Sequence, residues 1–100
     1  MAFDKRANAK IKAADSRRMF SEELDASKTV DIITLGFSAE KVSFQATGDL
    51  AGTIEFSING KDFFGSASIS TTPGSYSTHN VSSVRITRAT GSGRVAIAAV

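Results

Sequence analysis

The sequence predicts an all-β protein, a single antiparallel β-sandwich of about seven short strands, preceded by a helical N-terminal arm. The first observation behind this class is alternation, because Ile54, Phe56 and Ile58 are separated by polar residues and would share one face of a strand. The second is Asn59-Gly60, a pair that accepts the positive φ angles of a type I′ hairpin turn. The third is a change of composition near Thr29, where helix-forming residues give way to Ser, Thr and β-branched residues.

Residues 1–28 form the first predicted unit, a helical or extended N-terminal arm. They are rich in Ala, Lys, Arg and Glu and contain no Gly or Pro, which favours helix. Asp4 can cap a first helix that carries Ile11 in a thin apolar stripe, and Ser21 can cap a second short turn that carries Leu24. Helices this short are marginal alone in water, so we expect the arm to gain order only by packing against something else.

Residues 29–100 form the second predicted unit, the β-sandwich domain. Turn chemistry divides it at Thr47-Gly48-Asp49, Asn59-Gly60, Thr72-Pro73-Gly74 and around Gly91. No repeat of fixed period is present, which argues against a propeller or solenoid. The strands are expected near residues 29–35, 41–47, 52–59, 62–70, 75–78, 82–88 and 94–100.

The last predicted strand is apolar on both faces. Val95, Ile97 and Ala99 make one face, and Ala96, Ala98 and Val100 make the other. Two interpretations remain open: both faces are covered within one chain, or the second face lies against another copy of the protein. The second interpretation makes Ala96, Ala98 and Val100 the predicted self-association surface of a homo-oligomer.

Composition and charge exclude several classes of protein. The chain has 100 residues, no Cys and a formal net charge of +2, so it can form neither disulfides nor a thiolate metal site. Its apolar runs are far shorter than the roughly 20 residues of a membrane-spanning helix, and its first residues lack the apolar core of a secretory signal. The excess positive charge lies in residues 1–18, whereas residues 29–100 carry as many acidic as basic side chains.

No reaction centre and no cofactor are expected, so we predict that the protein is not an enzyme. His79 is the only histidine, and it lies in a stretch rich in Ser and Thr. Because hydroxyl groups are so common there, a Ser close to His79 in the sequence is not evidence for a catalytic Ser–His–Asp arrangement. The carboxylates are scattered over different turns and faces, which indicates neither a paired acid site nor a metal site. Acidic residues interleave with the basic ones of the arm, and the chain has one Tyr and no Trp, so nucleic acid is not the expected partner.

Two segments carry a family resemblance. The first is Gly48-Asp-Leu-Ala-Gly-Thr-Ile-Glu-Phe-Ser-Ile-Asn-Gly-Lys-Asp-Phe-Phe64, and the second is Val84-Arg-Ile-Thr-Arg-Ala-Thr-Gly-Ser-Gly-Arg-Val-Ala-Ile97. Each reads as a hairpin with its turn glycine in place. In this order they resemble the small β-sandwich structural proteins of tailed bacteriophage virions, among which are head decoration and cement proteins.

The resemblance implies a non-enzymatic virion structural protein. As a head decoration or cement protein it would bind and stabilise the capsid lattice, with the major capsid protein as its partner and a trimer as its oligomer. Its location would be the virion, on the head surface, after synthesis in the host cytoplasm. The alternative is a tail, neck or fibre-associated β-sandwich module that binds a host surface glycan, although aromatic residues that could stack on sugar rings are few.

The arm is the predicted attachment segment. Its apolar side chains either fold back on the sandwich as a lid or dock in a groove of the neighbouring protein, flanked by arginines that can bind carboxylates. In the docking interpretation, the sandwich keeps its fold after deletion of residues 1–24. The predicted partner-binding residues are Ile11, Arg17, Arg18, Met19, Phe20 and Leu24.

Overall fold

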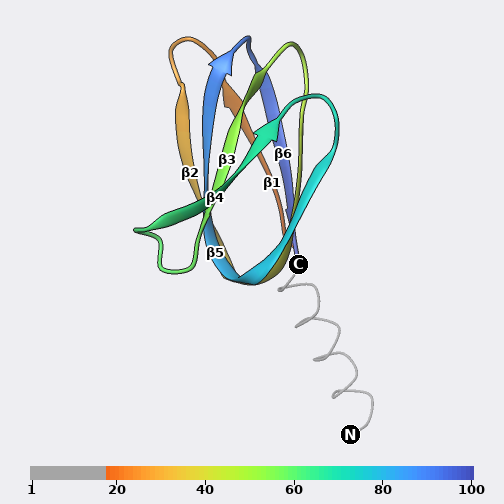
Figure 1. The fold of residues 1–100 in the computed structure, drawn as a ribbon. Helices are drawn as coiled ribbons and strands as arrows, with labels where there is room; N and C mark the ends of the chain where they lie inside the picture. Colours follow the sequence, from red (N-terminus) through yellow and green to blue (C-terminus); the bar gives the residue numbers. More distant parts are fainter. Residues whose placement is uncertain (1–17) are drawn as a thin grey trace, which may run out of the picture.

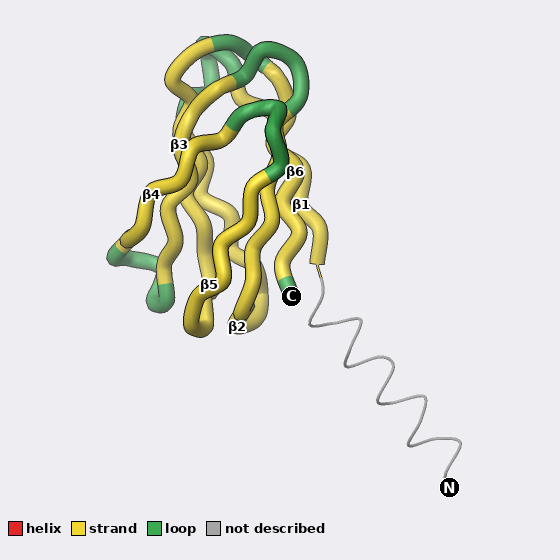
Figure 2. Tube along the Cα trace, turned by 45° about the vertical axis from the view of Figure 1, so that its right-hand side comes forward, coloured by secondary structure: helices red, strands yellow, loops and turns green. Residues whose placement is uncertain are grey.

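A computed structural model describes residues 18–100 of the chain, apart from the side chains of Thr78 and His79. Antiparallel strands joined by short loops make up these residues, with no helix among them (Figures 1 and 2). In chain order the strands are β1 (Arg18–Leu24), β2 (Val30–Ala46), β3 (Ala51–Ser57), β4 (Phe63–Ile69), β5 (Gly74–Thr90) and β6 (Gly93–Ala99). The predicted all-β antiparallel class is confirmed.

The strands form one hydrogen-bonded sheet in the order β1-β6-β2-β5-β3-β4. The two long strands, β2 and β5, pair with each other but have different outer neighbours along their lengths. Val42 of β2 lies between β5 and β6, whereas Ile86 of β5 lies between β2 and β3. The sheet curls, and the backbone N–H of Ala46 donates to the carbonyl oxygen of Ser70, which follows β4, over 2.8 Å. Figure 1 shows the strands arranged around a common interior.

Both long strands bend where the sequence suggested breaks. β2 contains Gly36 at φ 86° and shifts its register against β5 on either side of Ala39. In β5, Asn80 has φ 58°, a left-handed conformation that Asn tolerates better than most residues. A bulge bends a strand without ending it, so neighbouring expected strands are continuous here. The segments that join are 29–35 with 41–47 and 75–78 with 82–88.

Residues 18–24 form strand β1, so the prediction of a helical arm is wrong for this part of the chain. β1 runs antiparallel to β6, with Met19 opposite Ala98 and Leu24 opposite Gly93. Leu24 is only 1 % exposed. Pairing with β6 and burial of Leu24 outweigh helix propensities that differ by fractions of a kcal/mol per residue.

Two further expectations about the arm are affected. The short turn that Ser21 was expected to cap is a strand, and the boundary placed at residue 28 does not separate residues 18–24 from the sheet. Deletion of residues 1–24 would therefore remove a strand, contrary to the expectation that the fold survives it. The first predicted helix, capped by Asp4, lies outside the described residues.

The alternation of β3 predicts its buried face correctly as far as the strand extends. Ile54 and Phe56 are fully buried, whereas Ile58 is 56 % exposed because β3 ends at Ser57. The ring of Phe56 stacks on Tyr76, with ring centroids 4.4 Å apart and planes inclined by 10°. Phe56 is thus the aromatic centre of the interior.

The inner face of the last strand is also confirmed as core. Val95, Ile97 and Ala99 are fully buried. Every strand contributes to the same apolar cluster, for example through Leu24, Ile33, Ile54, Ile69, Val84 and Val95. Burial of such side chains is the main source of stability in a domain of this size.

The β3–β4 turn differs from the predicted type I′ turn. Gly60 has φ 80°, but Asn59 does not have a positive φ. Instead, the Asn59 side chain holds the turn, because its Oδ1 accepts hydrogen bonds from the backbone N–H groups of Lys61 at 2.8 Å and Asp62 at 2.9 Å. Asn often bonds to the backbone just ahead of it in this way. The connection is therefore the longer loop 58–62.

Glycine is required most strongly in the β5–β6 turn. Gly91 has φ 74°, and a Cβ there would stand 2.0 Å from the carbonyl oxygen of Asp49. Gly60 has a similar φ, but its Cβ would come no nearer than 3.7 Å to Ser83 Oγ. We expect Gly60→Ala to lower the free energy of unfolding by about 1–2 kcal/mol, the cost of the left-handed conformation, and Gly91→Ala to lower it by more. Urea unfolding of both variants checks this, and equal losses would contradict the close contact at Gly91.

Candidate functional site

In its middle, the outward face of β1, β6 and the second half of β2 is built from uncharged side chains, most of them small. Alternation along β6 places Ala96 and Ala98 on this face, where both are half-buried. The register puts Ala98 between Met19 of β1 and Ser43 of β2. Ala and Ser side chains rise little above the backbone, so another protein chain can approach this face closely. We call it the β6 face.

A groove with a volume of about 180 Å³ opens on the β6 face. The strand order puts Met19 of β1 and Gly74 of β5 at its two sides, with β6 and β2 between them. Met19 is 77 % exposed, and its side chain forms one side of the groove. The groove is lined by Met19, Ser43, Phe44, Gln45, Pro73, Gly74, Ala96 and Ala98, none of which is charged.

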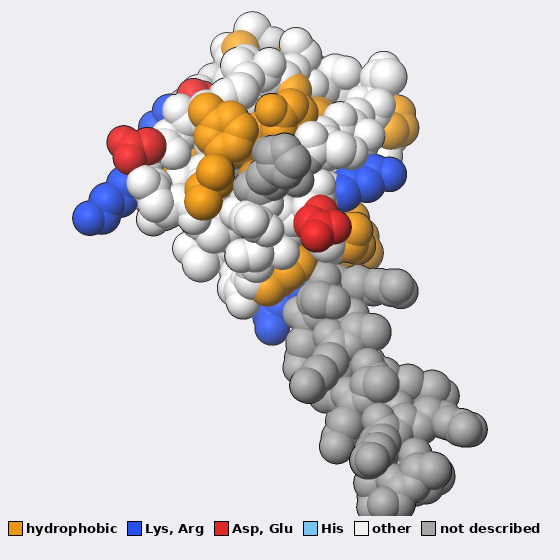
Figure 3. All heavy atoms as spheres, turned by 60° about the horizontal axis from the view of Figure 1, so that its bottom comes forward, with side chains coloured by type: hydrophobic (Ala, Val, Ile, Leu, Met, Phe, Trp, Pro, Cys, Tyr) orange, Lys and Arg blue, Asp and Glu red, His pale blue; other side chains and the backbone are white. Residues whose placement is uncertain are grey.

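Gly74 lets an aromatic ring reach the groove. A Cβ at this position would stand 2.6 Å from Cε2 of Phe44, so glycine leaves room for the ring against the backbone. Phe44 belongs to the core and also contributes to the lining of the groove. Figure 3 shows the lower side of the molecule, where hydrophobic side chains form several separate patches and acidic and basic side chains lie beside each other at the left edge.

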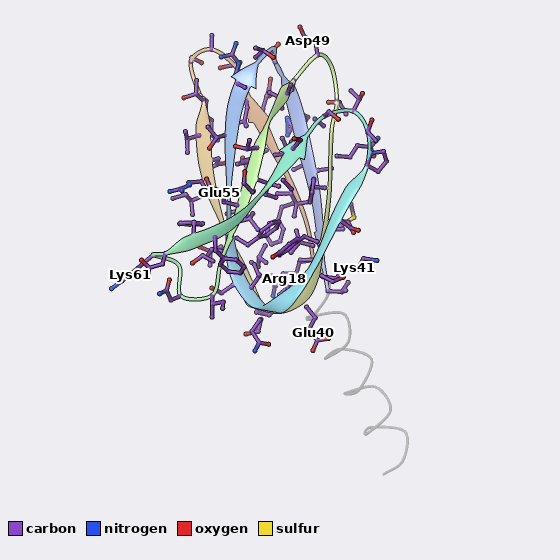
Figure 4. All side chains as sticks on the ribbon, in the orientation of Figure 1. Arg18, Glu40, Lys41, Asp49, Glu55 and Lys61 are labelled. Atoms are coloured by element: carbon purple, nitrogen blue, oxygen red, sulfur yellow. The ribbon has the colours of Figure 1, made fainter. Side chains whose placement is uncertain are left out.

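Charged residues stand at both ends of the β6 face. At one end, Arg94 Nη1 donates to Glu23 Oε2 at 3.2 Å, and both side chains are more than half exposed, so the pair contributes little to stability. At the other end, the backbone N–H groups of Glu40 and Lys41 donate to the backbone oxygen of Val100. Figure 4 shows Glu40 and Lys41 together at this end of the molecule. The apolar groove is thus bounded by charge along the strand direction.

The structure brings part of the predicted site together. Ala96, Ala98 and Met19 line one groove, a grouping that the sequence pattern does not predict. Val100 is 49 % exposed just beyond Ala98 and extends the apolar surface. Arg18 is exposed at the start of β1, but alternation places it on the other side of the strand from Met19, with its guanidinium near Gly36 of β2.

The other predicted partner-binding residues do not lie on this face. Leu24 is a core residue, so its prediction as a docking anchor is wrong: the β1–β6 pairing turns it into the protein's own interior. Phe20 is half-buried and packs against the same core. Both side chains therefore fold back onto the chain's own sheet, which was the alternative interpretation. Ile11 and Arg17 lie outside the described residues.

A second outward face, on β2, β5 and β3, carries a fixed arginine. Arg85 donates to Glu55 from Nε and from Nη2, each over 3.1 Å, and its guanidinium carbon lies 4.4 Å from the centre of the Phe63 ring. Ile32, opposite Arg85 in the register, is about half exposed. The two-pronged ion pair and the ring hold Arg85 in place, so this face offers a rigid surface instead of a mobile cation.

Several carboxylates of the described residues hold turns. Asp49 Oδ1 accepts the backbone N–H of Ser92 at 2.9 Å, and Asp62 Oδ2 accepts Nδ2 of Asn59 at 2.9 Å. Among the described side chains of residues 18–100, which leave out Thr78 and His79, no group of three or more Asp or Glu residues could hold a metal ion. In the same part of the chain, every buried side-chain nitrogen and oxygen has a hydrogen-bond partner. The described residues also include no helix with the length and apolar character needed to cross a membrane.

The loop between β1 and β2 holds a small charged cluster. Asp25 Oδ1 accepts the Ser27 hydroxyl at 2.6 Å and the backbone N–H groups of Ser27 and Lys28, and these hydrogen bonds lower the pKa of Asp25 below its ordinary value. Lys28 Nζ lies 3.3 Å from Asp31 and 3.5 Å from Glu22, and its bond with Asp31 is the main cause of its raised pKa. The cluster ties β1 to the beginning of β2.

These features define a small all-β antiparallel protein with an uncharged groove among its described residues. No protein-family model matches the sequence, and no curated protein matches it. Among solved structures, the chain is similar to the core of Drosophila NLP, whose structure is described as providing insight into pentamer formation and histone binding. The two chains are 14 % identical, the match covers 83 % of this chain and 96 % of that chain, and the TM-score is 0.38. A likeness at this level leaves the function to be inferred from the surface itself.

Proposed function

We propose that the chain is a non-enzymatic structural protein of a tailed-phage particle, a head decoration or cement protein that binds and stabilises the capsid lattice. The observation that carries the proposal is the open groove of the β6 face, which has no charged residue in its lining. Such a surface suits contact with another protein, because little polar surface has to be desolvated. The resemblance of residues 48–64 and 84–97 to virion proteins supports the assignment to a particle.

Self-association through the β6 face is part of this proposal, with three copies as the resemblance implies. Ala96, Ala98 and Val100 supply apolar contact, and Met19 can insert between copies. The segment before β1 is the proposed attachment to the major capsid protein, with Ile11 and Arg17 as its contact residues. Met19 then lies where the attachment segment meets the self-association face.

Replacing Ala98 by arginine is expected to disrupt the contact between copies. The new guanidinium would stand on the floor of the groove, where a partner surface would have to desolvate it. We expect self-association to weaken by about 100-fold or more. Ala89→Arg is the matched control, because Ala89 is exposed on β5 and undergoes the same chemical change. Light scattering over a range of concentrations measures both masses, and an unchanged mass for Ala98→Arg would exclude the β6 face.

We also propose that the curled sheet folds over to form a two-layered β-sandwich. One layer would hold β1, β6 and the second half of β2, and the other would hold β3, β4 and the second half of β5. The change of neighbours along β2 and β5 supports this division. The bend at Gly36 would carry β2 from one layer to the other.

Location in the particle tests the proposed function. Purified phage particles labelled with an antibody against this chain should carry the label over the head surface. Label confined to the tail tip would favour the alternative, a tail or fibre-associated module that binds a host glycan. Particles without label at either place would refute both.

A further inference from the structure

Strand β1 ends the sheet. In the strand order β1-β6-β2-β5-β3-β4, its one partner among the described residues is β6. An edge strand presents a row of backbone N–H and C=O groups on its outer side, which can pair with another strand. Edge strands are usually protected by charge or by bends, so the side chains of β1 decide which partner it can accept.

The charges of β1 are arranged for an antiparallel partner of identical sequence. Arg18 lies two residues before Phe20, and Glu22 lies two residues after it. The sequence continues the pattern, with arginine at position 17 and glutamate at position 23. If β1 pairs with a second copy around Phe20, each Arg18 stands opposite Glu22 of the second copy, and the two Phe20 side chains meet.

The same register also preserves the two faces of the strand. Along β1, Phe20 and Leu24 point to the interior, while Met19 and Ser21 point outward. Pairing around Phe20 puts Met19 beside Ser21 of the second copy, outward residue against outward residue. Pairing around Ser21 would also keep the faces, but it would place Arg18 opposite Leu24 and leave Glu22 opposite Phe20. Charge complementarity therefore selects the register centred on Phe20.

The ion pairs that Glu22 and Glu23 already make within one chain do not prevent new ion pairs with a second copy. Lys28 lies 3.5 Å from Glu22, with side chains 49 % and 38 % exposed, and the pair of Arg94 with Glu23 is also exposed. Exposed pairs of this kind contribute about 1 kcal/mol or less, so rearranging them costs little.

The other end of the sheet is a poorer edge. β4 contains Gly65 at φ 65°, which bends the strand, and its register against β3 shifts between Ile54 and Phe56. A bent edge cannot align a continuous row of backbone groups with a partner. Of the two ends of the sheet order, β1 is the one with a regular register along its whole length.

We propose that β1 is a docking edge for a second copy of this chain. The two β1 strands pair antiparallel with Phe20 on the two-fold axis, Arg18 binds Glu22 of the second copy, and the two sheets become continuous. This contact uses the edge of the sheet and leaves the β6 face open, so it is independent of the face contact proposed above.

The test exchanges the charges in the full chain, in an Ala98→Arg background that removes the face contact. Arg18→Glu and Glu22→Arg each place like charges opposite each other, so either variant alone should pair about 10- to 100-fold more weakly than the background protein. An equimolar mixture of the two restores every opposite-charge pair and should restore the pairing, as should the variant that carries both changes. Sedimentation velocity measures the masses.

Two controls separate this contact from general charge effects. Lys61→Glu, in the loop 58–62 (Figure 4), and Glu40→Arg, in β2, make the same charge changes outside β1 and should not alter the pairing. Circular dichroism confirms that each variant is folded. A mixture that pairs no better than its single variants would overturn the proposal, and so would a background protein that remains monomeric at millimolar concentration.

Disulfide cross-linking fixes the register and does not depend on the charge variants. The chain has no Cys, so Phe20→Cys and Ser21→Cys each introduce a single thiol. Residues directly opposite in an antiparallel pair have Cα atoms about 4.5–5.5 Å apart, which a disulfide can bridge. Mild oxidation should link Phe20→Cys into a covalent dimer and leave Ser21→Cys unlinked. Linkage of Ser21→Cys alone would overturn the proposed register.

Discussion

Deletion of residues 1–24 is expected to remove most of the stability of the protein. It takes away β1, leaves the outer edge of β6 unpaired and opens the core beside Leu24. Truncation of a single buried Leu to Ala costs about 2–5 kcal/mol, and a domain of this size has about 5–15 kcal/mol in total. The loss of a whole strand should therefore bring the protein close to unfolding at room temperature.

Deletion of residues 1–17 is the matched control, because it leaves all six strands in place. Its urea unfolding midpoint should stay close to that of the full chain, whereas that of the longer deletion should fall steeply. If both deletions unfolded at the same urea concentration, β1 would not be part of the cooperative fold.

Phe56→Ala should produce the largest loss from a single substitution. Phe56 is fully buried, stacks on Tyr76 at 4.4 Å and lies 6.5 Å from the ring of Phe64. Removal of a buried aromatic ring costs about 3–5 kcal/mol, because contacts are lost and a cavity remains. Equilibrium unfolding in urea measures the change in the free energy of unfolding.

Phe64→Ala is the control for this substitution. Phe64 is 38 % exposed, so we expect a loss of about 1 kcal/mol. Tyr76→Phe keeps the stacked ring and should change the stability less than Phe56→Ala does. Equal losses for Phe56→Ala and Phe64→Ala would contradict the position of Phe56 at the centre of the core.

The sequence predicts those parts of the fold in which local pattern and tertiary packing agree. The inner faces around Ile54 and Val95 follow from alternation, because residues two apart in a strand share a face. The turn at Gly91 follows from glycine, which alone adopts its φ at little cost. Gly36 and Asn80 also have positive φ angles, but they bend a strand and do not end it. Alternation alone does not distinguish such a bend from a turn, so the sequence predicts two short strands at each of these positions.

β1 shows where propensity misleads. Arg18, Met19, Glu22 and Leu24 are all good helix formers, and the decisive partner, β6, lies about 70 residues later in the chain. Phe20 and Leu24 are four residues apart, a spacing that also fits one face of a helix, and Glu22 between them interrupts any alternation. Pairing with a distant strand outweighed the local preference.

The groove of the candidate site could not be assembled from the sequence. Ala96 and Ala98 stand out because the last strand is apolar on both faces, but Ser43 and Gly74 come from strands whose register only the fold defines. Gly74 reads locally as a turn residue after Pro73. Its contact with the ring of Phe44 becomes visible only in three dimensions.

We propose that this chain acts through contacts that its β1 edge and β6 face make with other copies. Hydrogen–deuterium exchange of the full chain at low and high protein concentration tests it most directly. Amides in residues 18–24 and 93–99 should exchange more slowly as the protein concentration rises, while the exchange of those in the loop 58–62 should not change. Exchange that is independent of concentration in both strands, or protection confined to the loop 58–62, would contradict it.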